Sequence, residues 1–169
     1  MHFAHSPKMS QGIAAQPYKD HVDGVVSGAS RNAAGASDST CFGKLFVDAA
    51  QLAAEFHDLG KLDPLNQAVL AKEGRGKLPL NHVDAGVAEM MRRTTSKPAA
   101  VAALLIYSHH RGLPDFSELM QNQFRDIASH EKFGTAKQRT DEWLDRYLQI
   151  HHREVVCPAV PEATEYKAP

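Results

Sequence analysis

Residues 42–61 read FGKLFVDAAQLAAEFHDLGK and contain the clearest helical pattern in the chain. Apolar side chains recur there every three or four residues, so they form one stripe along the surface of a helix. Gly60 follows the stripe and is expected to end the helix in the left-handed conformation. The stripe predicts a helix that packs against others through Leu45, Phe46, Ala49, Leu52, Ala53, Phe56 and Leu59.

Further helices are expected on both sides of this one. A short helix is predicted around His21, where valines recur at helical spacing. Residues 27–40 are almost entirely small and polar, and we expect a mobile loop there because such residues bury too little apolar surface to offset their ordering. Strand-like alternation is missing, so the sequence predicts an all-α fold. Its other helices are expected within residues 65–73, 82–93, 98–110, 115–133 and 140–153.

Length and composition are those of one globular domain. The chain has 169 residues and 18.5 kDa, which is near the usual size of a single domain. We expect this domain to span residues 1–155. Residues 156–169 contain three prolines and are expected to be an extended tail or a truncated linker.

Overall charge and cysteine content narrow the classes of protein further. With a net charge of −1, the chain lacks the positive field that holds nucleic acid by charge alone, so any such binding must be local or metal-assisted. Two cysteines are too few for a disulfide framework, which favours reduced thiols and a cytoplasmic protein. No apolar run is long enough for a membrane span, so no membrane partner is expected.

Histidine is unusually frequent, with 10 residues, and two pairs draw attention. His57 and Asp58 follow the helical stripe, where an imidazole and a carboxylate can both reach a metal beyond the helix end. The alternative is a histidine that interacts with the helix dipole beside a solvated aspartate. His109 and His110 end a nearly all-apolar helix; metal ligation would remove the cost of burying them, and a polar helix end in water is the alternative.

Other histidines are weaker candidates when each is considered alone. His82 precedes Gly86 by four residues, so another backbone can approach closely beside its imidazole. His21 stands among valines and would usually be a half-buried structural residue. His151 and His152 end an amphipathic helix and are expected to complement its dipole, whereas His2, His5 and His130 carry no spacing argument.

Five segments, taken in order, resemble the HD phosphohydrolase superfamily. They are FAHS (3–6), KDHVDGV (19–25), FHDLGK (56–61), NHVDAG (81–86) and SHHRG (108–112). Within that superfamily their order is similar to the HD nuclease of type I CRISPR interference, which accompanies or is fused to a helicase. The resemblance covers residues 3–116 and depends on the ordered set rather than on any one segment.

The resemblance implies an HD-superfamily helical bundle and a site with one or two divalent metal ions. His21, His57 and Asp58 would surround one ion, and Asp58 would bridge to a second ion. That second ion would be held by His82, His109 and His110. Lys61 would lie beside the scissile phosphate, so Asp58 and Lys61 are the expected catalytic residues.

The implied activity is cleavage of single-stranded DNA in antiviral defence, with a helicase and a target-recognition complex as partners. Because the predicted ligands are mostly imidazoles, the residues themselves favour Mn, Ni, Co, Fe or Zn over Mg or Ca. Residues 61–97 carry seven Lys and Arg against four Asp and Glu, so residues 70–80 are the expected approach of the strand.

One element of the family pattern has no clear counterpart. The family's last ligand is an aspartate on a late helix, and the available Asp141 and Asp145 come early and lie on an amphipathic helix. Either the chain stops before that aspartate, or the site holds only one metal ion well. Two alternative functions also stay open. The chain could hydrolyse nucleotides or cyclic nucleotides with the same residues, or it could be a helical interaction module without catalysis.

Overall fold

The computed structural model describes residues 1–37, 41–74, 76–93, 95–110, 112 and 134–155, with side chains from residue 139 onward in the last range. In these ranges the protein is all-α, as predicted, apart from one small sheet. None of the described helices has the length and apolar character that a membrane crossing needs. The helices are α1 (Tyr18–Ser37), α2 (Gly43–Phe56), α3 (Pro64–Leu70), α4 (Val83–Arg92), α5 (Lys97–Ser108) and α8 (Gly134–Glu154).

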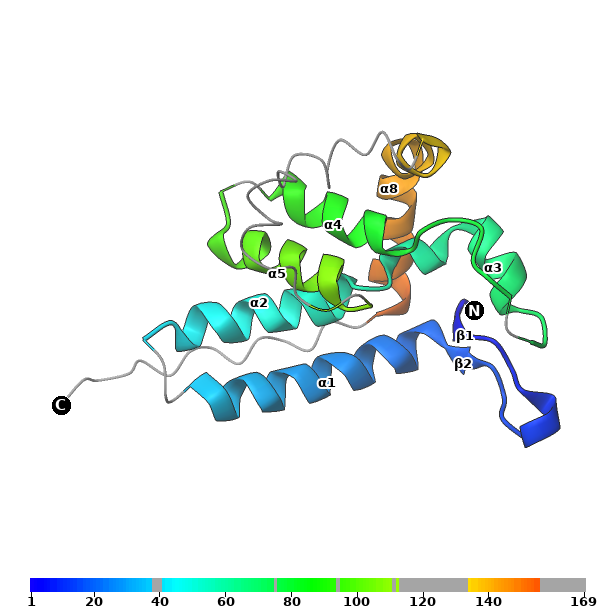
Figure 1. The fold of residues 1–169 in the computed structure, drawn as a ribbon, viewed down its shortest axis with the longest axis horizontal. Coiled ribbons are helices and arrows are strands. Elements are labelled where there is room, and N and C mark those ends of the chain that lie inside the picture. Colours follow the sequence, from blue (N-terminus) through cyan, green and yellow to red (C-terminus); the bar gives the residue numbers. More distant parts are fainter. Residues whose placement is uncertain (38–40, 75, 94, 111, 113–133, 156–169) are drawn as a thin grey trace.

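The helix α2, which carries the apolar stripe, lies at the centre of the arrangement. It packs between α1 and α5, while α4 lies against α5 and α8 (Figure 1). The 3-10 helix η2 (Leu59–Leu62) follows α2 and contacts α4 and α8. The largest buried apolar side chains come from all of these elements and form one core: Tyr18, Phe56, Leu59, Leu62, Met90, Ile106 and Tyr147.

Helix α1 extends further than expected, and the predicted mobile loop over residues 27–40 is wrong for residues 27–37. These residues continue α1 to Ser37, and residues 38–40 lie outside the described part of the chain. Val26 and Ala33 are buried, and Gln51 Nε2 of α2 donates a hydrogen bond to Ser30 Oγ at 3.1 Å. The packing of α2 against this small-residue surface therefore supplies the burial that the segment lacks by itself.

A short N-terminal hairpin corrects the expectation of no strands. Strand β1 (Phe3–His5) pairs antiparallel with β2 (Gln16–Pro17), and a 3-10 helix, η1 (Met9–Gln11), lies between them. The strands are too short to show an alternating pattern, so periodicity could not predict them. In the hairpin, β2 leads directly into α1, and this connection places β1 beside the start of that helix (Figure 1).

Glycines set the spacing of the helices around α2. Gly60 is not in the left-handed conformation that we expected, and the chain continues through it into η2. A Cβ atom at Gly60 would lie 2.5 Å from the carbonyl oxygen of His82, to which the Gly60 N–H donates a hydrogen bond at 3.1 Å. A Cβ at Gly86 would lie 2.3 Å from the Phe56 carbonyl oxygen, so the predicted close backbone approach at Gly86 is confirmed. Both glycines let α4 approach the end of α2.

Side chains at the helix starts define where α3 and α5 begin. Asp63 Oδ1 accepts a hydrogen bond from the Leu65 N–H at 2.7 Å, and Ser96 caps α5 in the same way. Asp63 is 1% exposed and also accepts hydrogen bonds from the Tyr147 hydroxyl and from Arg139 Nε. These bonds connect the start of α3 to α8.

The last part of the chain agrees with the sequence predictions only in part. Helix α8 begins at Gly134, earlier than the predicted start at residue 140. The helix predicted over residues 115–133 and the tail predicted over residues 156–169 lie outside the described residues. The proposed domain boundary at residue 155 therefore stays a prediction.

Candidate metal centre

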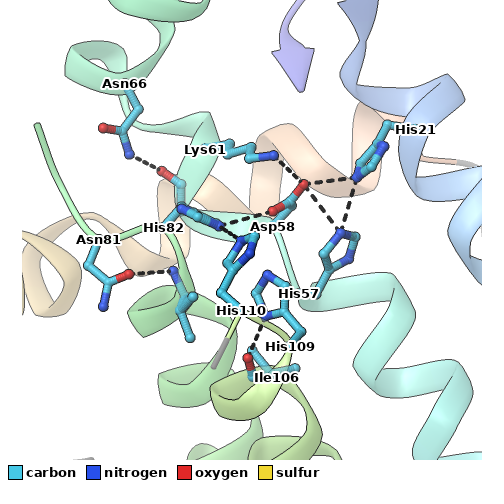
Figure 2. Close-up of polar contacts among 12 residues, drawn as sticks. His21, His57, Asp58, Lys61, Asn66, Asn81, His82, Ile106, His109 and His110 are labelled. Atoms are coloured by element: carbon cyan, nitrogen blue, oxygen red, sulfur yellow. Dashed lines mark hydrogen bonds and ion pairs between the residues drawn. The ribbon is translucent and has the colours of Figure 1, made fainter. Parts of the chain in front are cut away.

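Side chains on or directly beside four helices form one cluster where α2 ends. His21 lies on α1, His57 and Asp58 directly follow α2, and His82 directly precedes α4. His109 and His110 directly follow α5. Figure 2 shows that their side chains point toward one another, although they come from four separate parts of the sequence. The close approaches at Gly60 and Gly86 bring the start of α4 to the end of α2 and thus His82 to Asp58.

One group of potential ligands consists of His21, His57 and Asp58. His21 Nε2 lies 3.1 Å from His57 Nε2 and 3.0 Å from Asp58 Oδ2. His57 Nε2 lies 3.2 Å from the same carboxylate oxygen. Three donor atoms within this range of one another are close enough to bind one ion.

A second group consists of His82, His109 and His110, whose ligand atoms also lie within 4.8 Å of one another. His82 Nε2 lies 2.9 Å from His110 Nε2. The ring centroids of His109 and His110 are 3.9 Å apart. Since His109 and His110 are exposed, this group is open to solvent, unlike the buried carboxylate of Asp58.

The carboxylate of Asp58 joins the two groups (Figure 2). Its Oδ2 atom faces His21 and His57, whereas its Oδ1 atom lies 3.4 Å from His82 Nε2. This is the arrangement in which one carboxylate can bridge two neighbouring cations. The bridging position that the resemblance implies for Asp58 is therefore sterically available.

Backbone hydrogen bonds orient two of the imidazoles. His57 Nδ1 lies 2.8 Å from the Ala54 carbonyl oxygen, and His109 Nδ1 lies 2.6 Å from that of Ile106. A carbonyl oxygen only accepts, so each Nδ1 carries the proton and donates it. In the neutral ring the Nε2 lone pair of each histidine is then free to bind a metal, as is usual for histidine ligands.

The ligand atoms around Asp58 show whether a metal ion can be accommodated there. The Nε2 atoms of His21 and His57 converge on Asp58 Oδ2, at 3.0 and 3.2 Å. Both Asp58 oxygens are buried, and neither has a partner with hydrogen-bond geometry among the described residues. A cation between these atoms would satisfy them all, so the residues fit a divalent metal.

Ionisation states are consistent with metal binding. Burial tends to raise the pKa of Asp58, but contacts with His21 and His57 and the charge of Lys61 hold it well below its usual value. Burial lowers the pKa of His82 to about 3. Burial also lowers the pKa of His109, although its bond to the Ile106 carbonyl opposes this. Asp58 is therefore a carboxylate near neutral pH, and the imidazoles of His82 and His109 are neutral, as ligation requires.

Lys61 lies at the centre of the site. Its side chain is almost completely buried, and Nζ lies 2.7 Å from Asp58 Oδ2. The 3-10 turn of η2 places Lys61 three residues after Asp58, which brings the ammonium back over the carboxylate. A phosphate bound to a cation that Asp58 holds would therefore meet this charge.

The late aspartates do not reach the site. Asp141 and Asp145 are both exposed on α8, and Asp145 Oδ1 pairs with Arg92 at 2.6 Å. The seventh ligand that the family pattern includes thus has no counterpart among the described residues. All six predicted ligands and Lys61, by contrast, lie together.

Two histidines lie near the site although the sequence analysis did not name them as candidate site residues. His5 of β1 lies with its ring centroid 4.9 Å from that of His21. His151 is completely buried rather than exposed at a helix end, and its ring contacts Phe56 and the Tyr18 hydroxyl, at 3.0 Å from Nδ1. For His5 the FAHS segment was the only signal, and for His151 there was none beyond its place on α8.

Ion pairs neutralise part of the predicted excess of positive charge over residues 61–97. Lys61 pairs with Asp58, Arg92 pairs with Asp145, and Arg93 pairs with Glu89. Arg75 lies outside the described residues. The cations of this range that remain exposed without an ion pair in the described part of the chain are Lys72, Lys77 and Lys97.

Comparison of the chain with models of protein families, with curated proteins and with solved structures finds no significant match. The function therefore has to be argued from the side chains of the site.

Proposed function

We propose that this chain is a metal-dependent nuclease that hydrolyses phosphodiester bonds of single-stranded DNA. Its proposed setting is type I CRISPR interference, where a helicase and a target-recognition complex would supply the strand. The observation that carries the proposal is the buried carboxylate of Asp58, which lies between two groups of imidazoles. Such a set of ligands favours two transition-metal ions that share one carboxylate.

Each residue of the site has a distinct role in this proposal. His21 and His57 would hold one ion with Asp58, and His82, His109 and His110 would hold the second. Bound ions of this kind lower the pKa of a water molecule and neutralise negative charge on a phosphodiester. In the hydrolysis, the oxygen of water forms a bond to phosphorus while the bond from phosphorus to the leaving sugar oxygen breaks. The water gives up a proton, and the leaving oxygen takes up a proton to become a hydroxyl.

Lys61 would act on the substrate rather than on the ions. Its ammonium is already held against Asp58 by burial and by the turn of η2, so little side-chain freedom remains to be lost when a phosphate binds. There it would stabilise the charge that develops on the phosphate oxygens.

Two observations support a strand over a small nucleotide as substrate. The second group of ligands is open, since His109 and His110 are exposed. Lys61 lies on η2, and α3 follows η2 in the chain. Lys72 and Lys77 are exposed on the segment after α3. Cations outside the reacting centre suit a polyanion that extends beyond one phosphate.

The test measures metal content and cleavage together. The purified chain would be incubated with single-stranded DNA in Mn, Co, Ni, Fe or Zn, with EDTA as the blank, while elemental analysis counts the bound ions. We expect cleavage that EDTA abolishes. His57→Ala and Asp58→Ala should remove both bound metal and cleavage while helicity is retained, and His152→Ala, an exposed histidine on α8, is the matched control.

The two rival functions predict different results in the same experiment. A nucleotide hydrolase would hydrolyse nucleotides or cyclic nucleotides and leave single-stranded DNA intact. An interaction module would bind no metal and would show no metal-dependent rise in melting temperature. Cleavage of DNA by His57→Ala and Asp58→Ala at the wild-type rate would contradict the assignment of the site.

A further inference from the structure

The N-terminal hairpin brings a histidine to the edge of the metal centre. His5 ends β1 and is exposed, and its ring stands nearly perpendicular to that of His21, with the centroids 4.9 Å apart. His5 belongs to neither of the two groups of potential ligands found among the described residues. Its position beside the ligands, with part of the ring in solvent, is that of a residue that can contact a substrate.

The hairpin is fixed to the site by one side chain. Gln67 of α3 accepts a hydrogen bond from the Phe3 N–H and donates one to the Phe3 carbonyl oxygen, each at 2.9 Å. The same amide donates to the Lys61 carbonyl oxygen at 2.7 Å. Gln67 therefore connects strand β1 to the segment that carries Lys61. This connection holds His5 in a fixed position relative to Lys61.

The charges of Lys61 and Lys8 act on the His5 imidazole, and the charge of Asp58 acts on it with the opposite sign. In either protonation state the imidazole has at least one N–H donor for a phosphate oxygen. Lys8 lies on the same hairpin, at its bridge to Ile13, and has no ion pair within the described part of the chain.

The segment after α3 continues this positive surface. Ser6 Oγ donates to the Val69 carbonyl oxygen and the Gly74 N–H donates to the Pro7 carbonyl oxygen, both at 3.5 Å. The hairpin thus lies against the segment that carries the exposed Lys72 and Lys77. Figure 1 shows the hairpin and α3 at the same end of the molecule.

We propose that His5 and Lys8 form a phosphate-binding subsite, which holds a backbone phosphate of the DNA strand beside the phosphate that is cleaved. This inference rests on the proposed function. His5 donates a hydrogen bond to a phosphate oxygen, and Lys8 supplies the charge. The competing explanation gives His5 only a packing role against His21.

Substitutions at His5 separate these two roles. His5→Phe keeps an aromatic ring against His21 but removes the N–H donor. His5→Gln keeps a donor and removes the ring. If His5 binds phosphate, His5→Phe raises the KM for the oligonucleotide with little change in kcat, and His5→Gln restores part of the loss. If His5 only packs against His21, His5→Phe behaves as the wild type and His5→Gln is the damaging change.

The salt dependence of binding tests the role of Lys8 directly. Fluorescence anisotropy of a labelled single-stranded oligothymidylate would be measured in EDTA, where the strand is not cut, over a range of KCl concentrations. Lys8→Ala is expected to weaken binding about tenfold and to reduce the slope of log K against log salt by about 0.7, the value for one phosphate contact with a single strand. Lys44→Ala, which removes the same charge from an ion pair near the start of α2, is the matched control and leaves the slope unchanged.

The binding measurement is independent of whether the chain cleaves DNA. Binding that depends on Lys8, without cleavage in any metal, would support the subsite and contradict the proposed nuclease. Cleavage by the wild type with an unchanged slope in Lys8→Ala and an unchanged KM in His5→Phe would overturn the subsite alone. A wild-type chain that neither binds nor cleaves the oligonucleotide would overturn both.

Discussion

Lys61 Nζ lies 2.7 Å from Asp58 Oδ2, and both side chains are almost completely removed from solvent. The ammonium thus supplies positive charge to the carboxylate that is expected to bridge the metal ions. A cation at Asp58 would be attracted by the carboxylate and repelled by Lys61. The balance of these two effects can be measured by removing the lysine charge.

We predict that Lys61→Met destabilises the metal-free protein and strengthens metal binding. Breaking a buried ion pair leaves an uncompensated charge and costs about 3–5 kcal/mol. A bound ion would replace the missing charge, so the rise in melting temperature on adding Mn should be larger in Lys61→Met than in the wild type. Differential scanning fluorimetry with and without Mn measures both effects.

The matched control is Lys19→Met, which removes a lysine from an exposed pair with Asp23. Exposed pairs contribute at most about 1 kcal/mol, so this variant should show the wild-type response to Mn. A metal-induced rise that is equal to or smaller than the wild-type rise in Lys61→Met would show that Lys61 does not compete with the ion.

A second prediction concerns the number of ions. His110 belongs to the group with His82 and His109, which contains none of the residues of the other group. His110→Ala should therefore release one of two bound ions and lower cleavage by more than about tenfold. Elemental analysis and a cleavage assay on the same preparation provide the measurement. If the variant and the wild type hold equal numbers of ions, the separation into two sites is incorrect.

The sequence predicted the positions of the site residues better than it predicted the elements around them. Apart from His21, which lies within α1, the candidate ligands follow or precede helices, and apolar helices such as α2 and α5 leave a strong signal in the sequence. The order of the short segments around them then suggested a common site. The roles of these residues as ligands stay predictions.

The features that the sequence analysis mispredicted depend on tertiary packing, which a local sequence pattern cannot reveal. Residues 27–37 have little helical signal of their own, and contact with α2 supports their helix. Gly60 was expected to end a helix, yet its lack of a side chain serves the approach of the His82 backbone. His151 became a buried residue because Tyr18 and Phe56, both distant in the sequence, enclose it.

A third prediction tests the close approach at Gly86. The Phe56 carbonyl oxygen would lie 2.3 Å from a Cβ atom there, and backbone cannot move aside as a flexible side chain can. Gly86→Ala should therefore destabilise the protein by about 1–3 kcal/mol and weaken metal binding, because α4 must shift and carry His82 away from Asp58. Urea unfolding and metal titration measure these effects.

The control for this change is Gly28→Ala on α1. A Cβ at Gly28 meets nothing within 4 Å, so alanine should stabilise the helix by about 0.5–1 kcal/mol. Gly86→Ala with wild-type stability and metal affinity would mean that α4 does not need this approach.

The fourth prediction concerns the connection between η2 and α8. Asp63 caps α3 and receives hydrogen bonds from Tyr147 and Arg139 while it is 1% exposed. Asp63→Asn keeps an oxygen for the cap but loses the charge, and asparagine caps a helix about as well as aspartate. The hydrogen bonds from α8 should weaken, which lowers the free energy of unfolding by about 1.5–3 kcal/mol.

This variant also separates stability from chemistry. Asp63 lies two residues after Lys61, and the bonds to α8 hold that turn in place. We expect Asp63→Asn to retain its bound metal, since none of the ligands changes, but to cleave DNA more slowly because Lys61 is less firmly positioned. Tyr147→Phe removes one hydrogen bond and leaves the Asp63 charge with Arg139, so its loss of stability and rate should be smaller. A larger loss in Tyr147→Phe than in Asp63→Asn would indicate that the hydroxyl, and not the charge, holds the turn.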